Sequence, residues 1–498
     1  MAGLTPYQWR LFLFLSVATF FEGYDQIALT QILPELGEDL SVVESETGFT
    51  VAFINVGTIL AYALVRQADK WGRRRVLTIT IAGYTLFSFL TGLAPNVWFF
   101  AICQFVARIF LIGEWAISMV YAAEEFPAEK RGMMIGLIQA FSSLGAVACA
   151  GVVPLLLDAP WGWRTVYFVG TLPLILLAFA RRSLKESSRF DALTESERRE
   201  EKPLFRIWST PYRKRVLQLA VIWGLTYVCT QTAVTFWKNY AMLDEGGPRL
   251  DAKGVGLVIT IAAAGAMPLV FAVGKLLDRI GRRAGATIIF VATSLSCVAA
   301  YTVEEGRVAM TLAVLGAVFG ASAVLPVLNA YTTELFPTHL RSDAFAWSNN
   351  LLGRIGYVLA PAGVGLAAGT YGWGPPVALT AIGPLLALAL ILWLLPETRG
   401  KELEETAAIP TEYRSRTWVT GWSAGRMSGA GWDDREAGET RTRGDSRVGS
   451  FPLLLSSSHR QRAVCARGVP HRSLPSQRTR GSQACRARSV CAHGVPPG

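Results

Sequence analysis

The sequence is poor in charged residues. Asp, Glu, Lys and Arg make up only 17% of its 498 residues, whereas hydrophobic residues make up 51%. A soluble globular domain usually contains about 25% charged residues, so this composition argues against a soluble protein and favours one that lies in a membrane. The net charge is +11, but the sequence has no basic patch interleaved with aromatic residues of the kind that binds single-stranded nucleic acid. We therefore expect no nucleic-acid partner.

The sequence also lacks the patterns that carry enzyme chemistry. None of its seven cysteines has metal-ligand spacing, and we find no phosphate-binding glycine loop and no pairing of a nucleophile with a base. The first apolar run is too long for a cleavable signal peptide, and it contains acidic residues. These absences predict no metal, no cofactor and no enzymatic activity.

Long apolar runs, by contrast, are abundant. A helix needs about 20 apolar residues to cross the hydrocarbon core of a bilayer. Twelve segments reach this length, namely 11–33, 48–66, 76–94, 97–122, 133–157, 164–181, 216–241, 255–275, 285–303, 307–330, 343–368 and 374–395. The pattern predicts an all-α membrane protein with twelve transmembrane helices in two six-helix halves.

A polar segment divides the twelve runs into six and six. We expect a six-helix bundle at 1–181, a cytoplasmic loop between the halves at 182–215, a second bundle at 216–400 and a cytoplasmic tail at 401–498. The tail is rich in Arg, Ser and Gly and has no apolar periodicity, a composition that predicts disorder.

Basic residues lie on alternate sides of these runs. Segment 66–75 contains five of them, segment 182–215 ten and segment 274–284 four, whereas segment 34–47 contains none and has five acidic residues. Because Lys and Arg accumulate in cytoplasmic loops, we expect segment 66–75 and both termini to face the cytoplasm, with the protein in the plasma membrane.

The two halves carry the same short motifs at a nearly constant offset. YAAEEFP at 121–127 recurs as YTTELFP at 331–337, and DKWGRR at 69–74 recurs as DRIGRR at 278–283. LKESSRF at 184–190 and PETRG at 396–400 follow the sixth and the twelfth runs. Both halves begin on the same side of the membrane, so the pattern predicts parallel repeats related by an axis along the membrane normal.

These motifs resemble those of the major facilitator superfamily. DKWGRR and GKLLDRIGRR (274–283) are similar to its signature in the loops between helices 2 and 3 and helices 8 and 9, although Val65 stands where the family usually has glycine. The resemblance covers residues 1 to about 405. It implies the superfamily's fold, transport by alternating access, and function as a monomer.

Residues of the repeated motifs are candidates for cytoplasmic gating. An acid at a cytoplasmic turn can pair with nearby guanidinium groups in one conformation and release them in another. The alternative is that the arginines only fix the topology. The candidates are Asp69, Gly72, Arg73, Glu124, Arg131, Gly274, Asp278, Gly281, Arg282, Glu334 and Arg341.

Besides Glu114, which is nearer the cytoplasmic side, three charged residues lie inside apolar runs of the first half. Glu22 and Asp25 are three residues apart and share a helix face, and Arg108 reaches a similar depth in the fourth run. Each unpaired charge costs about 2.5–3.5 kcal/mol to insert, so we expect an acid to pair with Arg108. The stretch GYD (23–25) resembles the first helix of proton-coupled sugar porters and aromatic-acid:proton symporters. That resemblance implies proton coupling at Asp25 with Arg108 as partner, whereas Glu22 matches less well; a static ion pair is the alternative.

Arg354 is the residue that points to a substrate class. Its permanent charge and bidentate geometry suit a carboxylate or sulfonate. The stretch GRIGYVLAP (353–361) resembles the eleventh helix of organic-anion and aromatic-acid carriers, and typical sugar porters lack this arginine. The alternative is an internal ion pair with Asp25 or Glu22. Further candidates for the substrate cavity are Gln231, Asn329, Asn55, Trp237 and Tyr240.

Together these features predict a proton-coupled symporter for a small organic anion, such as an aromatic or aliphatic carboxylate. Its expected partners are the small-molecule substrate and the lipid bilayer, and its coupling ion is the proton. A proton-coupled sugar or polyol symporter and an exporter of drugs or metabolites are the alternatives.

Overall fold

The computed structural model describes residues 4–180, 184–186, 204–337, 340–401 and 406, which lie in one compact unit within residues 1–419. The side chains of residues 69, 128–129, 131–132, 176–180 and 271 fall outside this description. So do residues 187–203 of the predicted loop between the halves and almost all of the predicted tail. The described residues are nearly all helical and include no strand.

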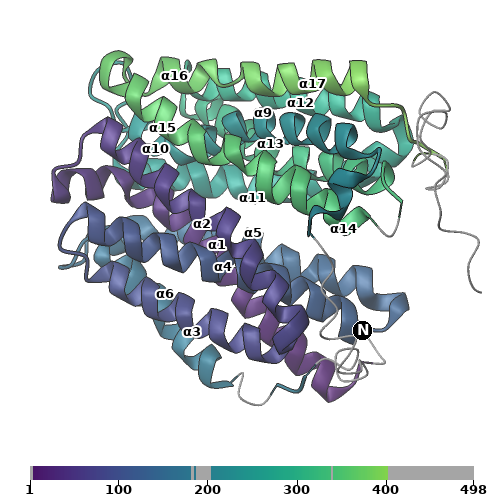
Figure 1. Ribbon diagram of the computed structural model, residues 1–498. Helices are drawn as coiled ribbons and strands as arrows, with labels where there is room; N and C mark the ends of the chain where they lie inside the picture. The colour runs from purple at the N-terminus through teal and green to yellow at the C-terminus, as the bar shows by residue number, and fades with distance from the viewer. Residues whose placement is uncertain (1–3, 181–183, 187–203, 338–339, 402–405, 407–498) are drawn as a thin grey trace, which may run out of the picture. The chain divides into compact units, whose positions relative to one another are not determined.

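Six helices of the described chain form the first half, and Figure 1 labels each of them. They are α1 (Pro6–Leu40), α2 (Glu44–Trp71), α3 (Arg73–Gly92), α4 (Val97–Glu125), α5 (Ala128–Leu157) and α6 (Arg164–Ala180). Helix α1 packs on α4, α5 and α6, while α2 and α3 both pack on α4. Helix α4 is therefore central to this half.

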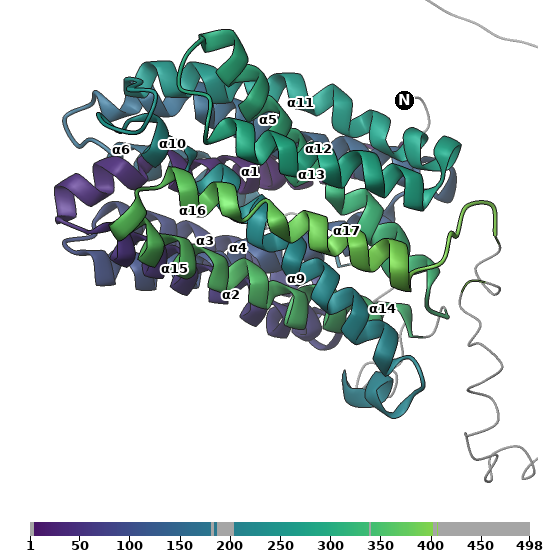
Figure 2. The ribbon, with the colours of Figure 1, turned by 90° about the horizontal axis from the view of Figure 1, so that it is seen from above.

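The second half follows the short turn η2 (Leu204–Ser209). Its helices are α9 (Arg213–Thr235), α10 (Trp237–Ala241), α11 (Ala252–Ile280), α12 (Arg282–Ala300), α13 (Arg307–Glu334), α14 (Arg341–Phe345), the π-helical segment η3 (Ala346–Gly353), α15 (Arg354–Tyr371), α16 (Gly374–Leu379) and α17 (Ile382–Leu394). Helix α9 packs on α13, α15 and α17, and α12 packs on α13 and α17 (Figure 2).

The helices account for the twelve predicted spans. Ten segments of the described chain are long and apolar enough to cross a membrane, judged by length and composition alone. Helix α1, which carries several charged residues, and helix α6, described over 17 residues, occupy the places of the first and sixth spans. The predicted all-α architecture of two six-helix halves is confirmed.

Three predicted spans are interrupted, which the sequence did not indicate. The span at 216–241 breaks at Phe236 between α9 and α10, and the span at 374–395 breaks between α16 and α17. The span at 343–368 contains the π-helical segment η3 directly before Arg354. Apolar runs report the length of a span and carry no information on its hydrogen-bond register.

The repeated motifs make the same tight turn in each half. Gly72 joins α2 to α3 with φ of +91°, and Gly281 joins α11 to α12 with φ of +98°. Only glycine adopts this backbone conformation without steric cost. The turn therefore explains both glycines and places the arginine after each one at the first position of a helix.

The two ends of the protein are packed differently. Two core clusters lie near the repeated motifs, and each consists of residues from one half alone. A third cluster joins buried residues of both halves, including Leu36 and Val153 from the first half and Tyr240 and Val255 from the second. We call the end with the turns at 71–73 and 280–282 the motif end and the other the opposite end. The halves share a core towards the opposite end.

Candidate functional site

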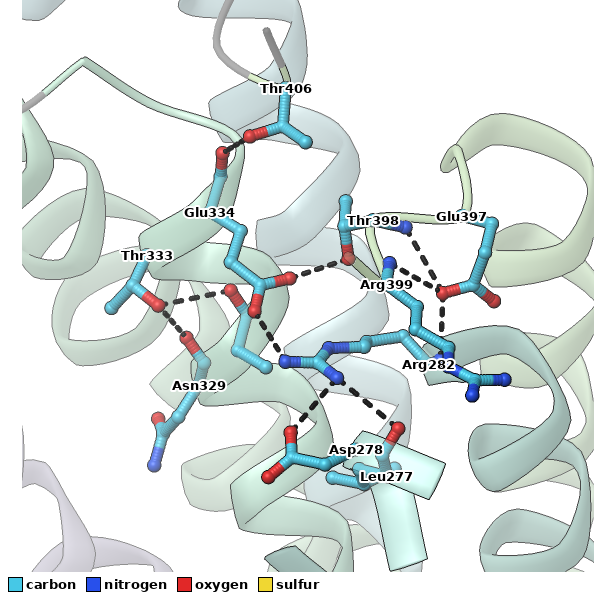
Figure 3. A network of polar contacts seen from close by, with 11 residues as sticks. Leu277, Asp278, Arg282, Asn329, Thr333, Glu334, Glu397, Thr398, Arg399 and Thr406 are labelled. Atoms are coloured by element: carbon cyan, nitrogen blue, oxygen red, sulfur yellow. Dashed lines mark hydrogen bonds and ion pairs between the residues drawn. The ribbon is translucent and has the colours of Figure 1, made fainter. Parts of the chain in front are cut away.

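The repeated motifs build matching ion-pair networks at the motif end. In the first half Arg73 pairs with Glu124, with 3.0 Å between Nη2 and Oε1, and donates to the main-chain oxygen of Ala68 at 2.9 Å. In the second half Arg282 pairs with Glu334 at 2.9 Å and donates to the main-chain oxygen of Leu277 at 3.2 Å (Figure 3). Each guanidinium thus ties the end of the preceding helix to the fourth helix of its half.

A carboxylate after the last helix of each half completes these networks. Glu397 accepts from the backbone N–H groups of Arg282 and Arg283 at 2.8 and 2.9 Å (the Arg282 contact is drawn in Figure 3). Glu186 accepts from the backbone N–H groups of Arg73 and Arg74 at 2.7 and 3.1 Å. Both acids lie at a helix N-terminus, where negative charge is stabilising. The repeat between the halves had shown that LKESSRF (184–190) and PETRG (396–400) occupy equivalent positions, but it did not predict these contacts.

Other predicted gating residues have mixed surroundings. Asp278 pairs with Arg282 at 3.1 Å, and Arg341 donates to the main-chain oxygen of Thr333 at 2.8 Å. A Cβ atom added to Gly274 would meet no atom within 4 Å. The side chains of Asp69 and Arg131 lie outside the described residues. The gating role of all these residues stays a prediction.

The pKa of Glu397, which lies beyond α17 and outside the membrane-spanning helices, is lowered. Partial burial raises the pKa of this carboxyl, but four backbone N–H groups donate to it and together lower the pKa below its ordinary value. The donors belong to Arg283, Arg282, Arg399 and Thr398. The charged form is therefore the one that the folded protein favours.

Glu397→Gln is expected to destabilise the protein at neutral pH and to flatten its loss of stability in acid. A lowered folded-state pKa contributes stability above the unfolded pKa, and this is lost as the pH falls through the folded pKa, here below about 4.5. The neutral-pH loss should be about 0.5–1 kcal/mol, as for other helix N-terminal acceptors. Thermal unfolding from pH 7 to pH 3 measures both effects. Glu305→Gln, in the exposed turn before α13, is the control, and equal flattening in that variant would contradict the assignment.

The predicted ion pair inside the first half is present. Asp25 Oδ2 and Arg108 Nη2 are 4.0 Å apart, and both side chains are about 95% buried. Tyr84 on α3 also interacts electrostatically with Asp25. The Nε atom of Arg108 is buried and has no hydrogen-bond partner among the described residues. The pair therefore leaves the guanidinium with an unused donor, and its role in proton coupling stays a prediction.

Glu22 has different partners. Ser142 on α5 donates to its Oε2 at 2.5 Å, and Gln26 donates to its Oε1 at 2.6 Å. The contact depends on a close crossing of α1 and α5, because a Cβ on Gly23 would lie 1.9 Å from the main-chain oxygen of Ser142. A Cβ on Gly145 would lie equally close to the backbone of α1. Small residues allow this approach of two helix backbones.

Arg354 lies beside a pair of aromatic rings in the second half, which contact each other edge to face at 5.4 Å. Its guanidinium carbon is 4.9 Å from the ring centre of Tyr357 and 5.4 Å from that of Tyr227. Tyr227 is fixed in turn by a hydrogen bond of 2.8 Å from its hydroxyl to Asn349 Oδ1. A Cβ on Gly356 would lie 2.1 Å from the main-chain oxygen of Gly224, so α9 and α15 cross closely here. This crossing brings the ring from α9 to the arginine on α15.

No carboxylate of the described residues forms an ion pair with Arg354, whose Nε is buried without a hydrogen-bond partner. The alternative of an internal pair with Asp25 or Glu22 is therefore not what this conformation shows. The Arg354 charge nevertheless acts on Glu22, on the other half of the protein. Arg354 and Glu22 thus interact electrostatically across the two halves.

The remaining predicted cavity residues are scattered. Asn55 reaches across the halves and donates to the main-chain oxygen of Tyr357 at 3.4 Å. Gln231 donates to Thr235 at 3.3 Å, and Trp237 is fully buried with its N–H on the main-chain oxygen of Ala300. Tyr240 is buried, and the side chain of Asn329 is exposed and points away from the motif network (Figure 3). Of these residues, only Asn55 contacts a neighbour of Arg354, namely Tyr357, in the described part of the chain.

Several residues of the site escaped prediction from the sequence. Ser142 and Tyr84 interact with the acids of α1, and Tyr227 faces Arg354, yet each is far away along the chain. Tyr357 is three residues after Arg354 and so shares its helix face, which is a signal that the spacing did contain. The other contacts depend on helix crossings that no local pattern reveals.

Comparisons with known proteins agree with this architecture. The family model of the Major Facilitator Superfamily matches residues 15–246 and 245–432. A gallate transporter from Pseudomonas putida is 25% identical over 78% of this chain and 92% of its own length. A niacin transporter from Acinetobacter baylyi is 24% identical over 77% of this chain and 93% of its own. An inward-open structure of a xylose transporter from Escherichia coli has a TM-score of 0.63 at 20% identity, over 80% of this chain and 99% of that one, a likeness of fold alone.

The family model covers most of the chain in two successive matches, of which the first extends through α9 and α10 and the second begins before α11. The chain therefore belongs to the major facilitator superfamily, a family of multi-pass membrane transporters.

Proposed function

We propose that the protein is a proton-coupled symporter that takes up a small organic anion, an aromatic or aliphatic carboxylate, across the plasma membrane. Both termini face the cytoplasm in this proposal, so the motif end is the cytoplasmic end. The halves rock about a central site in which Arg354 holds the anion and the pair of Asp25 with Arg108 carries the proton.

The observation that carries the proposal is the state of Arg354. It is a permanent cation in the interior whose guanidinium lies near the rings of Tyr227 and Tyr357 and, among the described residues, has no carboxylate partner. A cation placed in a membrane interior is costly unless it is paired or faces a cavity. A substrate carboxylate supplies the missing partner, and the adjacent rings are suited to an aromatic substrate.

The acids of α1 support the proposal that transport is coupled to protons. Asp25 lies 4.0 Å from the Arg108 guanidinium, which has one buried donor without a partner among the described residues. The long distance favours an ion pair in which Arg108 can change its partner. Protonation of Asp25 weakens its hold on Arg108, and a change in access to water shifts the proton equilibrium of the carboxyl. Relatives named for niacin, gallate and sialic acid transport favour an organic acid as substrate.

The proposal is tested by uptake into reconstituted vesicles. The full-length protein is given radiolabelled nicotinate, gallate, an aliphatic carboxylate and a hexose, each with and without an inward proton gradient. We expect carboxylates to accumulate with the gradient and to leak out after a protonophore is added. Gradient-driven accumulation of the hexose without any carboxylate uptake would support the sugar symporter instead. Loading the vesicles with carboxylate and finding only export would support an exporter.

A further inference from the structure

Lys238 connects the two halves at the opposite end. Its ammonium pairs with Glu35 Oε1 of α1 at 2.5 Å and also donates to the main-chain oxygen of Gln31. The lysine side chain is only 1% exposed and the Glu35 side chain 23%. Glu38, one turn further along α1, adds a second negative charge that acts on Lys238. A buried lysine is thus held entirely by groups of the other half.

The local backbone explains how α1 offers these acceptors. Pro34 lies within α1, directly before Glu35. A proline inside a helix has no N–H and opens the backbone hydrogen-bond ladder. The carbonyl that loses its helical donor is that of Thr30, and the carbonyl of the next residue, Gln31, accepts from Lys238. On the other side, the break at Phe236 ends α9 and starts α10, so that Lys238 projects from a separate short helix.

The same junction buries polar atoms that have no hydrogen-bond partner among the described residues. These are both amide atoms of the Gln31 side chain, Oε2 of Glu35, Oδ1 of Asn239 and the hydroxyl of Tyr240. A buried polar atom without a partner destabilises the state that buries it. These atoms therefore destabilise the closed junction, whereas the ion pair stabilises it. Opposing contributions of this kind allow a closed and an open conformation of similar free energy.

A second ion pair between the halves provides a contrast. Lys253 of α11 pairs with Asp158 after α5 at 3.0 Å, also at the opposite end. Its side chains are 61% and 64% exposed, and exposed ion pairs contribute little to stability. Removing one partner of a buried pair is far more disruptive, because the other charge stays buried without compensation. Of these two pairs, the buried one is therefore the stronger restraint.

We propose that the Lys238–Glu35 pair is a latch, which keeps the opposite end closed and must break before that end can open. The shared core of the two halves lies at this end, so opening must separate it as well. When the latch breaks, Lys238, Glu35, Gln31 and Tyr240 become hydrated together. The latch concerns the equilibrium between conformations and does not depend on which substrate is carried.

Distance measurements between spin labels test the latch. The full-length protein, without its native cysteines, is reconstituted in nanodiscs and labelled at Val43 and Glu305, two exposed positions at the opposite end on different halves. A second preparation is labelled at Arg75 and Ser342, exposed positions at the motif end. Lys238→Met should lengthen the first distance and shorten the second, with the ratio of closed to open populations reduced about tenfold or more.

Two further variants complete the design. Glu35→Gln breaks the latch from the other half and is expected to shift both distances in the same direction as Lys238→Met. Lys253→Met removes a lysine from the exposed pair at the same end and should leave both distributions unchanged. The latch is refuted if Lys238→Met and Glu35→Gln keep the closed distribution, or if Lys253→Met opens that end as far as they do.

Discussion

Arg354→Ala is expected to reduce carboxylate uptake by about a hundredfold or more in kcat/KM. A buried charge that meets an oppositely charged ligand contributes about 2–5 kcal/mol when its removal leaves the ligand charge without a partner. Arg354 is the only cation of the site that has no carboxylate partner within the described chain, because Arg108 is already paired with Asp25. Uptake of labelled carboxylate into vesicles, measured as an initial rate over a range of concentrations, gives the change.

The chemistry at Arg354 predicts a graded series. Arg354→Lys keeps the charge but loses the planar fork and its contact with the rings of Tyr227 and Tyr357, so we expect uptake between that of wild type and Arg354→Ala. Arg307→Ala, which removes an exposed arginine at the start of α13, is the matched control and should transport normally. Wild-type carboxylate uptake by Arg354→Ala would defeat the proposed anion site.

The sequence predicted those features that depend on residues close together in the chain or on the repeat between the two halves. Apolar run length predicted the twelve spans. The offset between the halves predicted that Arg73 and Arg282 occupy equivalent positions and that Glu124 and Glu334 do, whereas the ion pairs that join them are findings of the structure. The cost of an unpaired charge in a membrane predicted that an acid pairs with Arg108, without deciding between Asp25 and Glu22. Each of these inferences requires only the residue, its neighbours and its copy in the other half.

Features set by helix crossings could not be predicted in this way. Ser142 meets Glu22 because Gly23 and Gly145 let α1 and α5 approach closely, and nothing in the spacing of 22 and 142 indicates it. Lys238 lies near the end of the apolar run 216–241, and its partner Glu35 is one of five acidic residues in segment 34–47, so neither position indicates the other. Their contact depends on how the two halves pack, which is a property of the assembled protein.

The second large effect is expected from Asp25→Asn. An asparagine has the shape of the aspartate but takes up no proton, so the variant should lose gradient-driven accumulation and only equilibrate its substrate. Exchange of external for internal substrate requires no net proton movement, and it should persist. Loss of accumulation with retained exchange separates a coupling residue from a static ion pair, because breaking a static pair would slow both processes together. Parallel assays of net uptake and counterflow in the same vesicles measure the two.

Glu22→Gln is the matched comparison for Asp25→Asn. Ser142 and Gln26 hold both oxygens of Glu22, and a glutamine can keep the Ser142 contact through its amide oxygen. We therefore expect Glu22→Gln to retain more gradient-driven accumulation than Asp25→Asn does. If a variant with both substitutions still concentrates its substrate in response to the proton gradient, neither acid carries the coupled proton. The pair of Asp25 with Arg108 would then serve to fix the packing of α1 against α4.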